Sequence, residues 1–366
     1  MLIPFCVLAT ALSVAAATRP QDPPPKPFPQ AVTEAWERAG ARAGGSRVFT
    51  FEKEWTPGCL KDLPAPPAPF GLAFLSLKLT EADLNDLARF RELDLLQFRN
   101  TKLTDAGLKP LAKVKGLREL DLEGGNRVTG SGLKELGGLE HLQELWLRGS
   151  DVTDEGLKEI VALKHLRELH LGHNTITDAA LESVAALKGL RLLSLCDTKV
   201  TDKGMKSIGR LKELRFLDLS YTTVRDTGLE DLAGLANLET LILDDTGVTH
   251  DGLKTVAGFR KLRCLVLQNT WVTDKGVAAI AGLEKLSELN LQNTQVTDDG
   301  VKEVVKLKGL RKLNLGKTLV TDAGLKDLAS LKDLEWLELR DLKLSRKAVE
   351  ELEKALPKCQ FWYDRQ

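Results

Sequence analysis

The sequence predicts an α/β solenoid, a fold that grows by stacking one short unit on the next. Three observations carry this prediction: a fixed internal period, a hydrophobic pattern that changes from helical to strand-like spacing within each period, and an unbroken leucine column. The chain has 366 residues, which by length alone would suggest two or three globular domains. A fixed repeat overrides that estimate, because stacked units lengthen one continuous core.

The first seventeen residues, MLIPFCVLATALSVAAA, carry no charged side chain and end in three alanines. An apolar run before such a site is typical of a secretory signal peptide, so we expect cleavage after Ala17. The alternative is a retained membrane anchor, but the run of about 16 residues is shorter than the roughly 20 that span a bilayer. We therefore expect an exported protein, either periplasmic, envelope-associated or secreted, with no membrane span after cleavage.

A proline-rich linker is expected at residues 18–30, because clustered prolines favour an extended chain. Residues 31–78 are expected to cap the N-terminal end of the solenoid. Within this region, helical spacing of apolar residues predicts a helix over 31–43 that Gly44 and Gly45 stop.

Repeats of 24 residues are expected to occupy residues 79–343, followed by a C-terminal cap at 344–366. One aligned hydrophobic position marks the period: Leu79, Leu103, Val128, Val152, Ile176, Val200, Val224, Val248, Val272, Val296, Val320 and Leu344. Only the step to Val128 is one residue longer, which gives eleven repeats. The first half of each unit has the three-to-four spacing of a helix, and the last half alternates as in a short strand.

A second column, two residues before the aligned position, keeps short side chains that both donate and accept hydrogen bonds. Its members are Thr101, Asn126, Ser150, Asn174, Thr198, Thr222, Thr246, Thr270, Thr294 and Thr318. Buried backbone groups in the turn after each strand need partners, and we expect this ladder to supply them. Leu342 breaks the column at the last repeat.

The recurring Thr-Asp pair, as in Thr201 and Asp202, predicts the start of a helix. The threonine is a typical N-cap, and the aspartate in the first turn interacts favourably with the helix dipole. The rival interpretation is a calcium ladder, because aspartate recurs at eight aligned positions. Each site would offer one carboxylate, whereas calcium takes six to eight oxygens. We expect a structural device here, with no metal and no cofactor.

No nucleophile–base pair, phosphate-binding loop or H-E-x-x-H helix is visible, so we expect no enzymatic activity. The histidines at 141, 165, 170 and 173 fall short of the three or four convergent ligands of a zinc site. The chain carries 52 Lys+Arg against 52 Asp+Glu. This balance argues against a nucleic-acid partner, which requires a concentrated basic face.

The pattern L-x-x-L-x-L-x-x-[T/N] at this period resembles the leucine-rich repeat. The T-D-x-G-L helix start is similar to the cysteine-containing subclass of that family, although the repeated cysteines are missing. The resemblance covers residues 79 to about 363. It implies a curved, horseshoe-shaped solenoid, with parallel strands on the concave face, helices on the convex face, and a binding role.

The strand residues beside the inward leucines vary between repeats, which suits a recognition surface. The candidate partner-binding residues are Trp146, His170, Leu192, Phe216, Ile242, Val266 and, on the adjoining loop, Trp271. We expect Phe216, Ile242 and Val266 to point outward as interface anchors. An acidic group is the alternative surface: Glu119, Asp121, Glu123, Glu144 and Glu168. An ordinary scatter of surface residues is the plainest alternative.

Together these patterns favour an exported binding module that presents its concave face to a macromolecule, with a protein as the expected partner. The alternative is a self-associating structural scaffold of the cell envelope. A more distant alternative is an enzyme with an unrecognised site.

Overall fold

The structure is a computed structural model that describes residues 27–43, 47–52 and 55–364. The expected signal segment at 1–17 and most of the linker at 18–30 lie outside the described residues. The strands follow chain order in a 15-stranded sheet, which confirms the predicted α/β solenoid class. The described residues fall into two compact units, an N-terminal unit of residues 27–194 and a C-terminal unit of residues 195–364.

In the N-terminal unit, β1 and β2 are antiparallel and the later strands pair in parallel with their chain neighbours. The strands are β1 (Arg42–Ala43), β2 (Val48–Phe51), β3 (Phe70–Leu75), β4 (Leu93–Arg99), β5 (Glu119–Asp121), β6 (Glu144–Trp146), β7 (Glu168–His170) and β8 (Leu192–Ser194). The helices are α2 (Gln30–Arg38), α3 (Glu81–Leu84), α4 (Leu108–Leu111), α5 (Asp154–Leu157) and α6 (Asp178–Val184). Short 3-10 helices complete the unit: η1 (Cys59–Asp62), η2 (Asn85–Arg89), η3 (Asp105–Gly107), η4 (Leu133–Gly138) and η5 (Lys158–Ala162).

The C-terminal unit is more regular, with one parallel strand and one α-helix in almost every repeat. The strands are β9 (Phe216–Asp218), β10 (Thr240–Ile242), β11 (Cys264–Val266), β12 (Glu288–Asn290), β13 (Lys312–Asn314), β14 (Trp336–Glu338) and β15 (Gln360–Trp362). The helices are α7 (Asp202–Ile208), α8 (Asp226–Asp231), α9 (Gly252–Val256), α10 (Asp274–Ile280), α11 (Asp298–Val304), α12 (Asp322–Leu328) and α13 (Arg346–Ala355).

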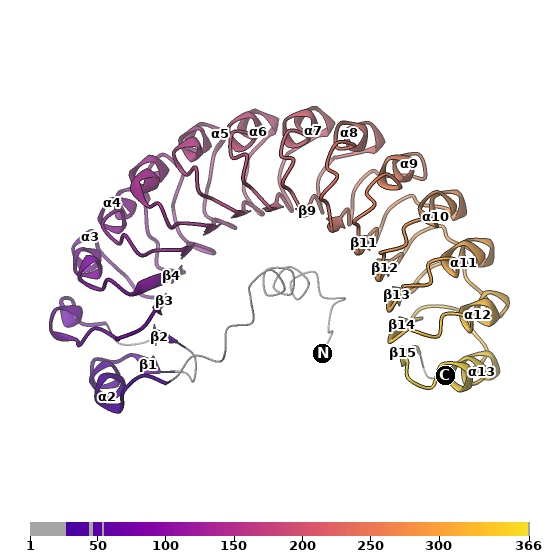
Figure 1. Cartoon of the computed structure of the whole chain (residues 1–366), viewed down its shortest axis with the longest axis horizontal. Helices are drawn as coiled ribbons and strands as arrows, with labels where there is room; N and C mark the ends of the chain where they lie inside the picture. The colour runs from indigo at the N-terminus through magenta and orange to yellow at the C-terminus, as the bar shows by residue number, and fades with distance from the viewer. Residues whose placement is uncertain (1–26, 44–46, 53–54, 365–366) are drawn as a thin grey trace. The chain divides into compact units, whose positions relative to one another are not determined.

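Within each unit the helices lie on one side of the strands (Figure 1). From β5 to β14, the middle residue of each three-residue strand points toward the helices and is fully buried, as Leu217 and Leu289 show. The two flanking residues point to the opposite side of the sheet, which we call the open face. Full burial of one leucine stabilises the fold by about 1.5–3 kcal/mol, so the repeated column supplies much of the driving force.

Aromatic side chains close the N-terminal end of the hydrophobic core. Trp36 of α2 stacks on Phe49 at a ring-centroid distance of 4.6 Å, and its Nε1–H donates to Pro64 O at 3.0 Å. The predicted stop of this helix at Gly44 and Gly45 is wrong. The helix ends at Arg38 because Gly40 takes the left-handed conformation, with φ of 93°.

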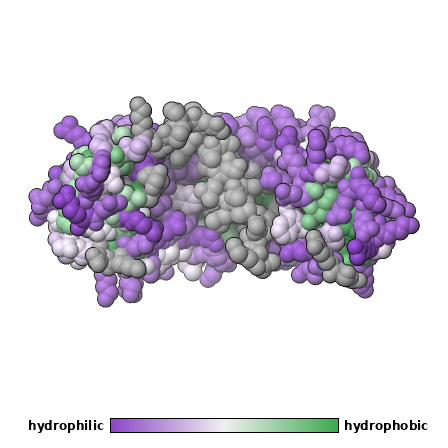
Figure 2. All heavy atoms as spheres, turned by 90° about the horizontal axis from the view of Figure 1, so that it is seen from below, coloured by the Kyte–Doolittle hydropathy of each residue, from purple (hydrophilic) through white to green (hydrophobic). Residues whose placement is uncertain are grey.

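No helix in the described part of the chain is both long enough and apolar enough to cross a bilayer. The surface visible in Figure 2 is mainly hydrophilic, and hydrophobic residues appear in smaller areas. This distribution agrees with a charged-residue content of 28%.

Candidate functional site

The ladder residues are all buried in the turns that follow the strands. From Thr198 to Thr318, each threonine hydroxyl donates to the carbonyl oxygen three residues earlier at 2.6 Å, as Thr222 does to Leu219. In the N-terminal unit, Asn126 Nδ2 donates to Phe98 O and, at 2.8 Å, to Leu122 O. These side chains complete the hydrogen bonding of backbone groups that water does not reach.

The repeated aspartates make contacts that the sequence pattern did not indicate. Asp274 Oδ1 accepts a hydrogen bond from the Thr297 N–H at 2.8 Å, and its Oδ2 accepts one from the Thr297 hydroxyl at 2.7 Å. The same arrangement joins Asp226 to Thr249 and Asp298 to Thr321. Each carboxylate therefore ties the start of one helix to the start of the next.

This geometry explains both halves of the Thr-Asp motif. The N-cap prediction is confirmed at Thr201, whose hydroxyl accepts a hydrogen bond from the Lys203 N–H at 3.3 Å. The motif keeps a glycine two residues after the aspartate because the aspartate of the preceding repeat fills the space beside that glycine. A Cβ on Gly324 would lie 2.5 Å from Asp298 Oδ1. Hydrogen bonds from Gly132 and Thr129 outweigh the effect of burial at Asp105 and lower the pKa of its carboxyl.

Metal binding gains no support from this arrangement. Both carboxylate oxygens of Asp154, Asp226, Asp274 and Asp298 are engaged with the next repeat. Across residues 27–43, 47–52 and 55–364, no three His, Cys, Asp or Glu side chains come together as a metal site would require.

The third residue of the strands forms a column on the open face that varies less freely than the sequence suggested. The side chains of Asp121, Asp218, Asn290, Asn314 and Glu338 each accept a hydrogen bond from the backbone N–H two residues later. These residues are buried, and their side chains hydrogen-bond the backbone just after the C-terminal end of their own strands. Four residues of the same column have no side-chain oxygen that could accept this hydrogen bond: Trp146, His170, Ile242 and Val266.

Trp146 and His170 stack face to face on neighbouring strands β6 and β7. Their ring centroids lie 3.6 Å apart with an interplanar angle of 8°. Trp146 is half-buried and His170 is 7% exposed. Within the described residues, Trp146 Nε1 and His170 Nε2 are buried without a hydrogen-bond partner. Burial, and then the positive charge of Arg148, lower the pKa of His170 to about 3, so the ring is neutral.

Carboxylates lie on the strands that carry this stacked pair and on the strand before them. Glu119, Glu144 and Glu168 stand in register on β5, β6 and β7, at the other flank of the inward leucines. Asp121 pairs with Arg99 at 2.9 Å. Burial, and then the charge of Asp121, raise the pKa of Glu123.

Two further carboxyl groups lie close together on the open face of the C-terminal unit. Asp218 and Asp244 are 6% and 7% exposed. Burial, and then the charge of Asp218, raise the pKa of Asp244 to about 7. Asp244 Oδ1 accepts a hydrogen bond from the Gln268 N–H at 3.2 Å. Gln268 lies two residues after Val266, so Asp244 supplies the acceptor that the apolar side chain of Val266 cannot provide.

The expectation that Phe216, Ile242 and Val266 present an exposed apolar patch is wrong. They come from the adjacent strands β9, β10 and β11, as expected, but are only 1%, 0% and 1% exposed. Strands about 4.8 Å apart bring flanking side chains into contact, so apolar neighbours shield one another. Leu192, in the N-terminal unit, is also buried, at 3% exposed.

Trp271 differs from the other candidates because it is 64% exposed. It belongs to a row formed by Gly247, Trp271, Gln295 and Leu319. Each backbone N–H in this row donates to a valine carbonyl of the preceding repeat at 2.9–3.1 Å, which fixes the spacing of the row. Leu319 is 61% exposed, so two large apolar side chains project from a rigid backbone.

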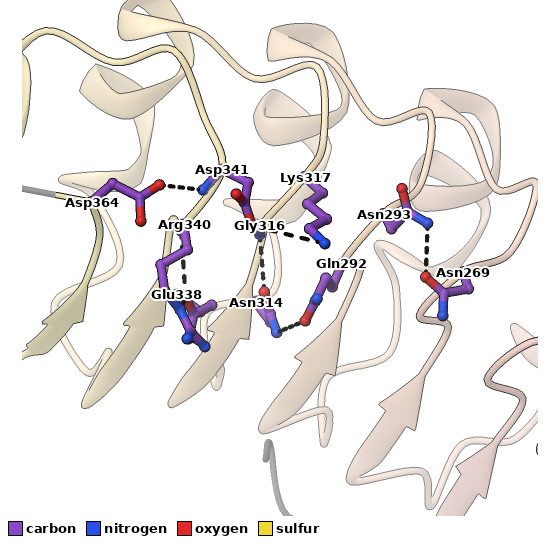
Figure 3. Close-up of polar contacts among 10 residues, drawn as sticks. All are labelled: Asn269, Gln292, Asn293, Asn314, Gly316, Lys317, Glu338, Arg340, Asp341 and Asp364. Carbon is purple, nitrogen blue, oxygen red and sulfur yellow. Dashed lines mark hydrogen bonds and ion pairs between the residues drawn. The ribbon is translucent and has the colours of Figure 1, made fainter. Parts of the chain in front are cut away.

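Side-chain amides form a second row, along the turns that follow the strands of the C-terminal unit (Figure 3). Asn293 Nδ2 donates to Asn269 Oδ1 at 2.7 Å, and Asn269 Nδ2 donates to Asp245 Oδ2 at 2.7 Å. Asn269 and Asn293 have φ values of 56° and 53°, a conformation that asparagine tolerates well. Their first role is therefore to form the turn and to join adjacent repeats.

The fold and these side chains define a class of protein: a strand–helix solenoid whose repeated polar residues maintain the frame. A family model described as leucine-rich repeat region matches residues 177–360, just over half of the chain. A second model, described as leucine rich repeat, matches residues 138–161 and 162–185. The chain belongs to the leucine-rich repeat family, as the resemblance implied. No curated protein sequence matches it.

Solved structures share this fold at low sequence identity. An internalin, inlF from Listeria monocytogenes, is 20% identical with a TM-score of 0.61, over 92% of this chain and 93% of that chain. The plant peptide hormone receptor RGFR1, in complex with RGF2, is 16% identical with a TM-score of 0.50. That match covers 89% of this chain and 52% of the receptor chain, so this chain spans about half of the receptor structure.

Proposed function

We infer that this chain is a non-enzymatic binding module for a protein partner, and that Trp271 anchors the contact. The observation that carries this proposal is the 64% exposure of Trp271 in a row that also exposes Leu319. Tryptophan is enriched among the residues that contribute most to protein–protein affinity. At this exposure the side chain contributes little to folding, and the buried leucines and the polar ladder already account for the frame.

The similar folds support a binding role. One of them, RGFR1, is a peptide hormone receptor in complex with RGF2.

The experiment is site-specific photo-cross-linking in the native extract. A benzophenone amino acid replaces Gln295, which lies between Trp271 and Leu319 in the exposed row. The control carries the same cross-linker at Lys326, an exposed position on helix α12. We expect a discrete protein adduct from position 295 that is lost when Trp271→Ala is added. The same adduct from both positions, or an adduct that survives Trp271→Ala, would contradict the proposal.

We also propose that the protein is exported, with residues 1–17 as the signal segment and 18–30 as a linker to the folded chain. The support is the uncharged apolar run that ends at Ala17. The T-D-x-G-L helix start further supports kinship with the cysteine-containing subclass. Mass spectrometry of the native protein should give Thr18 as the N-terminal residue, and an intact Met1 terminus would refute cleavage.

Self-association remains the second candidate because of the C-terminal end of the sheet. Among the described strands, β15 pairs only with β14, and Trp362 on β15 is 42% exposed. A cavity of about 380 Å³ lies beside it, lined in part by Leu342, Leu344 and Val349. An open strand edge can pair with another chain. Light scattering tests this candidate: a mass that rises with concentration would support it, and a constant monomer mass would exclude it.

A further inference from the structure

Side-chain amides are concentrated in one part of the C-terminal unit. Seven of the eighteen asparagine and glutamine residues of the chain lie between Gln268 and Asn314. One of them, Gln295, belongs to the row of Trp271. The other six end or follow the adjacent strands β11, β12 and β13, and we call them the amide array: Gln268, Asn269, Asn290, Gln292, Asn293 and Asn314. Three adjacent repeats thus present neutral hydrogen-bonding groups, in a chain of which 28% is charged.

The buried asparagines of the array fix the direction in which the glutamine amides face. Asn314 Oδ1 accepts the Gly316 N–H at 2.9 Å, and its Nδ2 donates to Gln292 Oε1 at 3.0 Å (Figure 3). Asn290 Oδ1 accepts the Gln292 N–H at 2.9 Å, and its Nδ2 lies 3.5 Å from Gln268 Oε1, a weaker contact. The oxygen of each glutamine is therefore directed to the next repeat, which leaves Nε2 as the free end of the amide.

The glutamine Nε2 groups have hydrogen-bonding capacity that the fold does not use. Within the described residues, the side chains of Gln268 and Gln292 only accept hydrogen bonds, and neither Nε2 is among the buried atoms that lack a partner. Both side chains are half-buried, so Nε2 can reach solvent. The frame does not require glutamine here, because the equivalent positions hold Ser220, Gly316 and Arg340. Two pairs of N–H donors, one repeat apart, are available to a ligand.

The charged side chains beside the array are already engaged. Three ion pairs lie on or just after β12, β13 and β14: Glu288 with Lys312, Glu338 with Arg340, and Asp341 with Lys317. On the other side of the array, Asp245 Oδ2 accepts the Asn269 Nδ2–H at 2.7 Å. A charged ligand would have to compete with these contacts, which favours an uncharged one.

The spacing of the donors distinguishes between two kinds of uncharged polymer. Parallel strands lie about 4.8 Å apart, so Gln268 and Gln292 repeat at about that distance. An extended polypeptide presents carbonyl groups on one side only about every 6.8 Å, so it does not keep register with the array. A chain of β-1,4-linked pyranose rings advances one ring at nearly the strand spacing. Its hydroxyl groups both donate and accept hydrogen bonds, as side-chain amides do.

We propose that the amide array binds a neutral, extended polysaccharide of β-1,4-linked pyranose rings. Successive rings lie across β11 and β12, where the Nε2–H groups of Gln268 and Gln292 donate to hydroxyl oxygens. Asn293 Oδ1, which accepts no hydrogen bond within the described residues, accepts a hydroxyl hydrogen. Asn290 and Asn314 already hold the glutamine oxygens, so binding immobilises few additional side-chain rotamers.

This site goes beyond the protein contact proposed at Trp271, because it takes another class of ligand. The array and Trp271 are separated along the chain by the buried Thr270. We expect Trp271→Ala to change the polysaccharide Kd less than twofold. Loss of the protein adduct from position 295 leaves the polysaccharide site untouched, and absence of polysaccharide binding leaves the Trp271 contact untouched.

The test is a nuclear magnetic resonance titration of the full chain with cellohexaose and with chitohexaose, two neutral β-1,4-linked hexasaccharides. We expect at least one of them to shift the side-chain amide signals of Gln268 and Gln292 to saturation. The double variant Gln268→Met with Gln292→Met keeps the side-chain length and removes both amides, so its Kd should be at least tenfold weaker. The matched control Gln143→Met with Gln360→Met removes two exposed amides elsewhere and should change Kd less than twofold.

Two checks keep the outcome decisive. Circular dichroism melting shows whether each variant is folded, and the amide shifts of the wild type test the site independently of any variant. Maltohexaose has α-1,4 linkages that curl the chain, so it should bind at least tenfold more weakly than the better β-linked sugar. Four results would each overturn the proposal: no shift of the two glutamine amides by either β-linked sugar, equal weakening in both double variants, a comparable loss in Trp271→Ala, or equal binding of maltohexaose.

Discussion

Asp244 offers a direct test of the electrostatics of the open face. The substitution Asp244→Asn removes its charge and keeps the side-chain oxygen that accepts the Gln268 N–H. Burial and the nearby Asp218 raise the pKa of Asp244 from 3.8 to about 7. Each pKa unit corresponds to 1.36 kcal/mol, so an ionised Asp244 destabilises the fold by roughly 4 kcal/mol. We therefore expect the asparagine variant to be more stable than the wild type at pH 8.

The sign of the pH dependence follows from the raised pKa. Between pH 3.8 and about 7 the unfolded chain has lost the proton while the folded chain keeps it, so rising pH destabilises the wild type. The advantage of Asp244→Asn should thus grow from pH 4 to pH 7 and stay constant above that. Urea unfolding between pH 4 and pH 8.5 measures it, with the exposed Asp231→Asn on α8 as a charge-matched control. A variant no more stable than the wild type at pH 8, or an advantage independent of pH, would refute this reasoning.

Three other predictions address the frame and the stacked pair. Thr222→Val should cost about 1–3 kcal/mol by leaving a buried carbonyl unbonded, and Thr223→Val less, since the Thr223 hydroxyl bonds Val200 O at 3.2 Å in an exposed position; equal melting temperatures would contradict this. Gly324→Ala should lower the melting temperature, because its Cβ would press on the Asp298 carboxylate 2.5 Å away; an unchanged value would show that the contact relaxes freely. Nuclear magnetic resonance should find the His170 ring neutral from pH 8 down to pH 5, because burial lowers its pKa to about 3; a titration midpoint above pH 5 would exclude the buried neutral ring.

The sequence was sufficient to predict the frame because the frame repeats. A leucine that recurs at one position of every unit has to face a continuous core, and a threonine before an aspartate has few roles other than starting a helix. The aspartate bridge between repeats was missed because its partner lies 23 residues away, at Thr297 for Asp274. The recurrence of threonine at that same spacing was the available signal.

The exposed side chains were harder to predict from the sequence, because the exposure of each one depends on how its neighbours in space pack around it. Alternation along a strand places Phe216 on the open face, but it does not say how closely the neighbouring side chains pack over it. The double variant Phe216→Asp with Val266→Asp should therefore unfold the protein or lower its melting point sharply, since it places two charges in buried positions. Trp271 was predictable as exposed because it lies on a loop, outside the alternation of the strands.

The central claim is that the repeated polar residues build the frame and that an exposed side chain on this frame binds the partner. Calorimetric titration of the cross-linked partner, once purified, against three proteins tests this most directly: the wild type, Trp271→Ala and Trp362→Ala. Trp362 is a second exposed tryptophan, remote in sequence and outside the row of Trp271. The account predicts at least a thirtyfold weaker Kd for Trp271→Ala, the loss of about 2 kcal/mol expected of an anchor residue, with Trp362→Ala and all melting temperatures unchanged. An unchanged Kd for Trp271→Ala, or an equal loss for both variants, would contradict it.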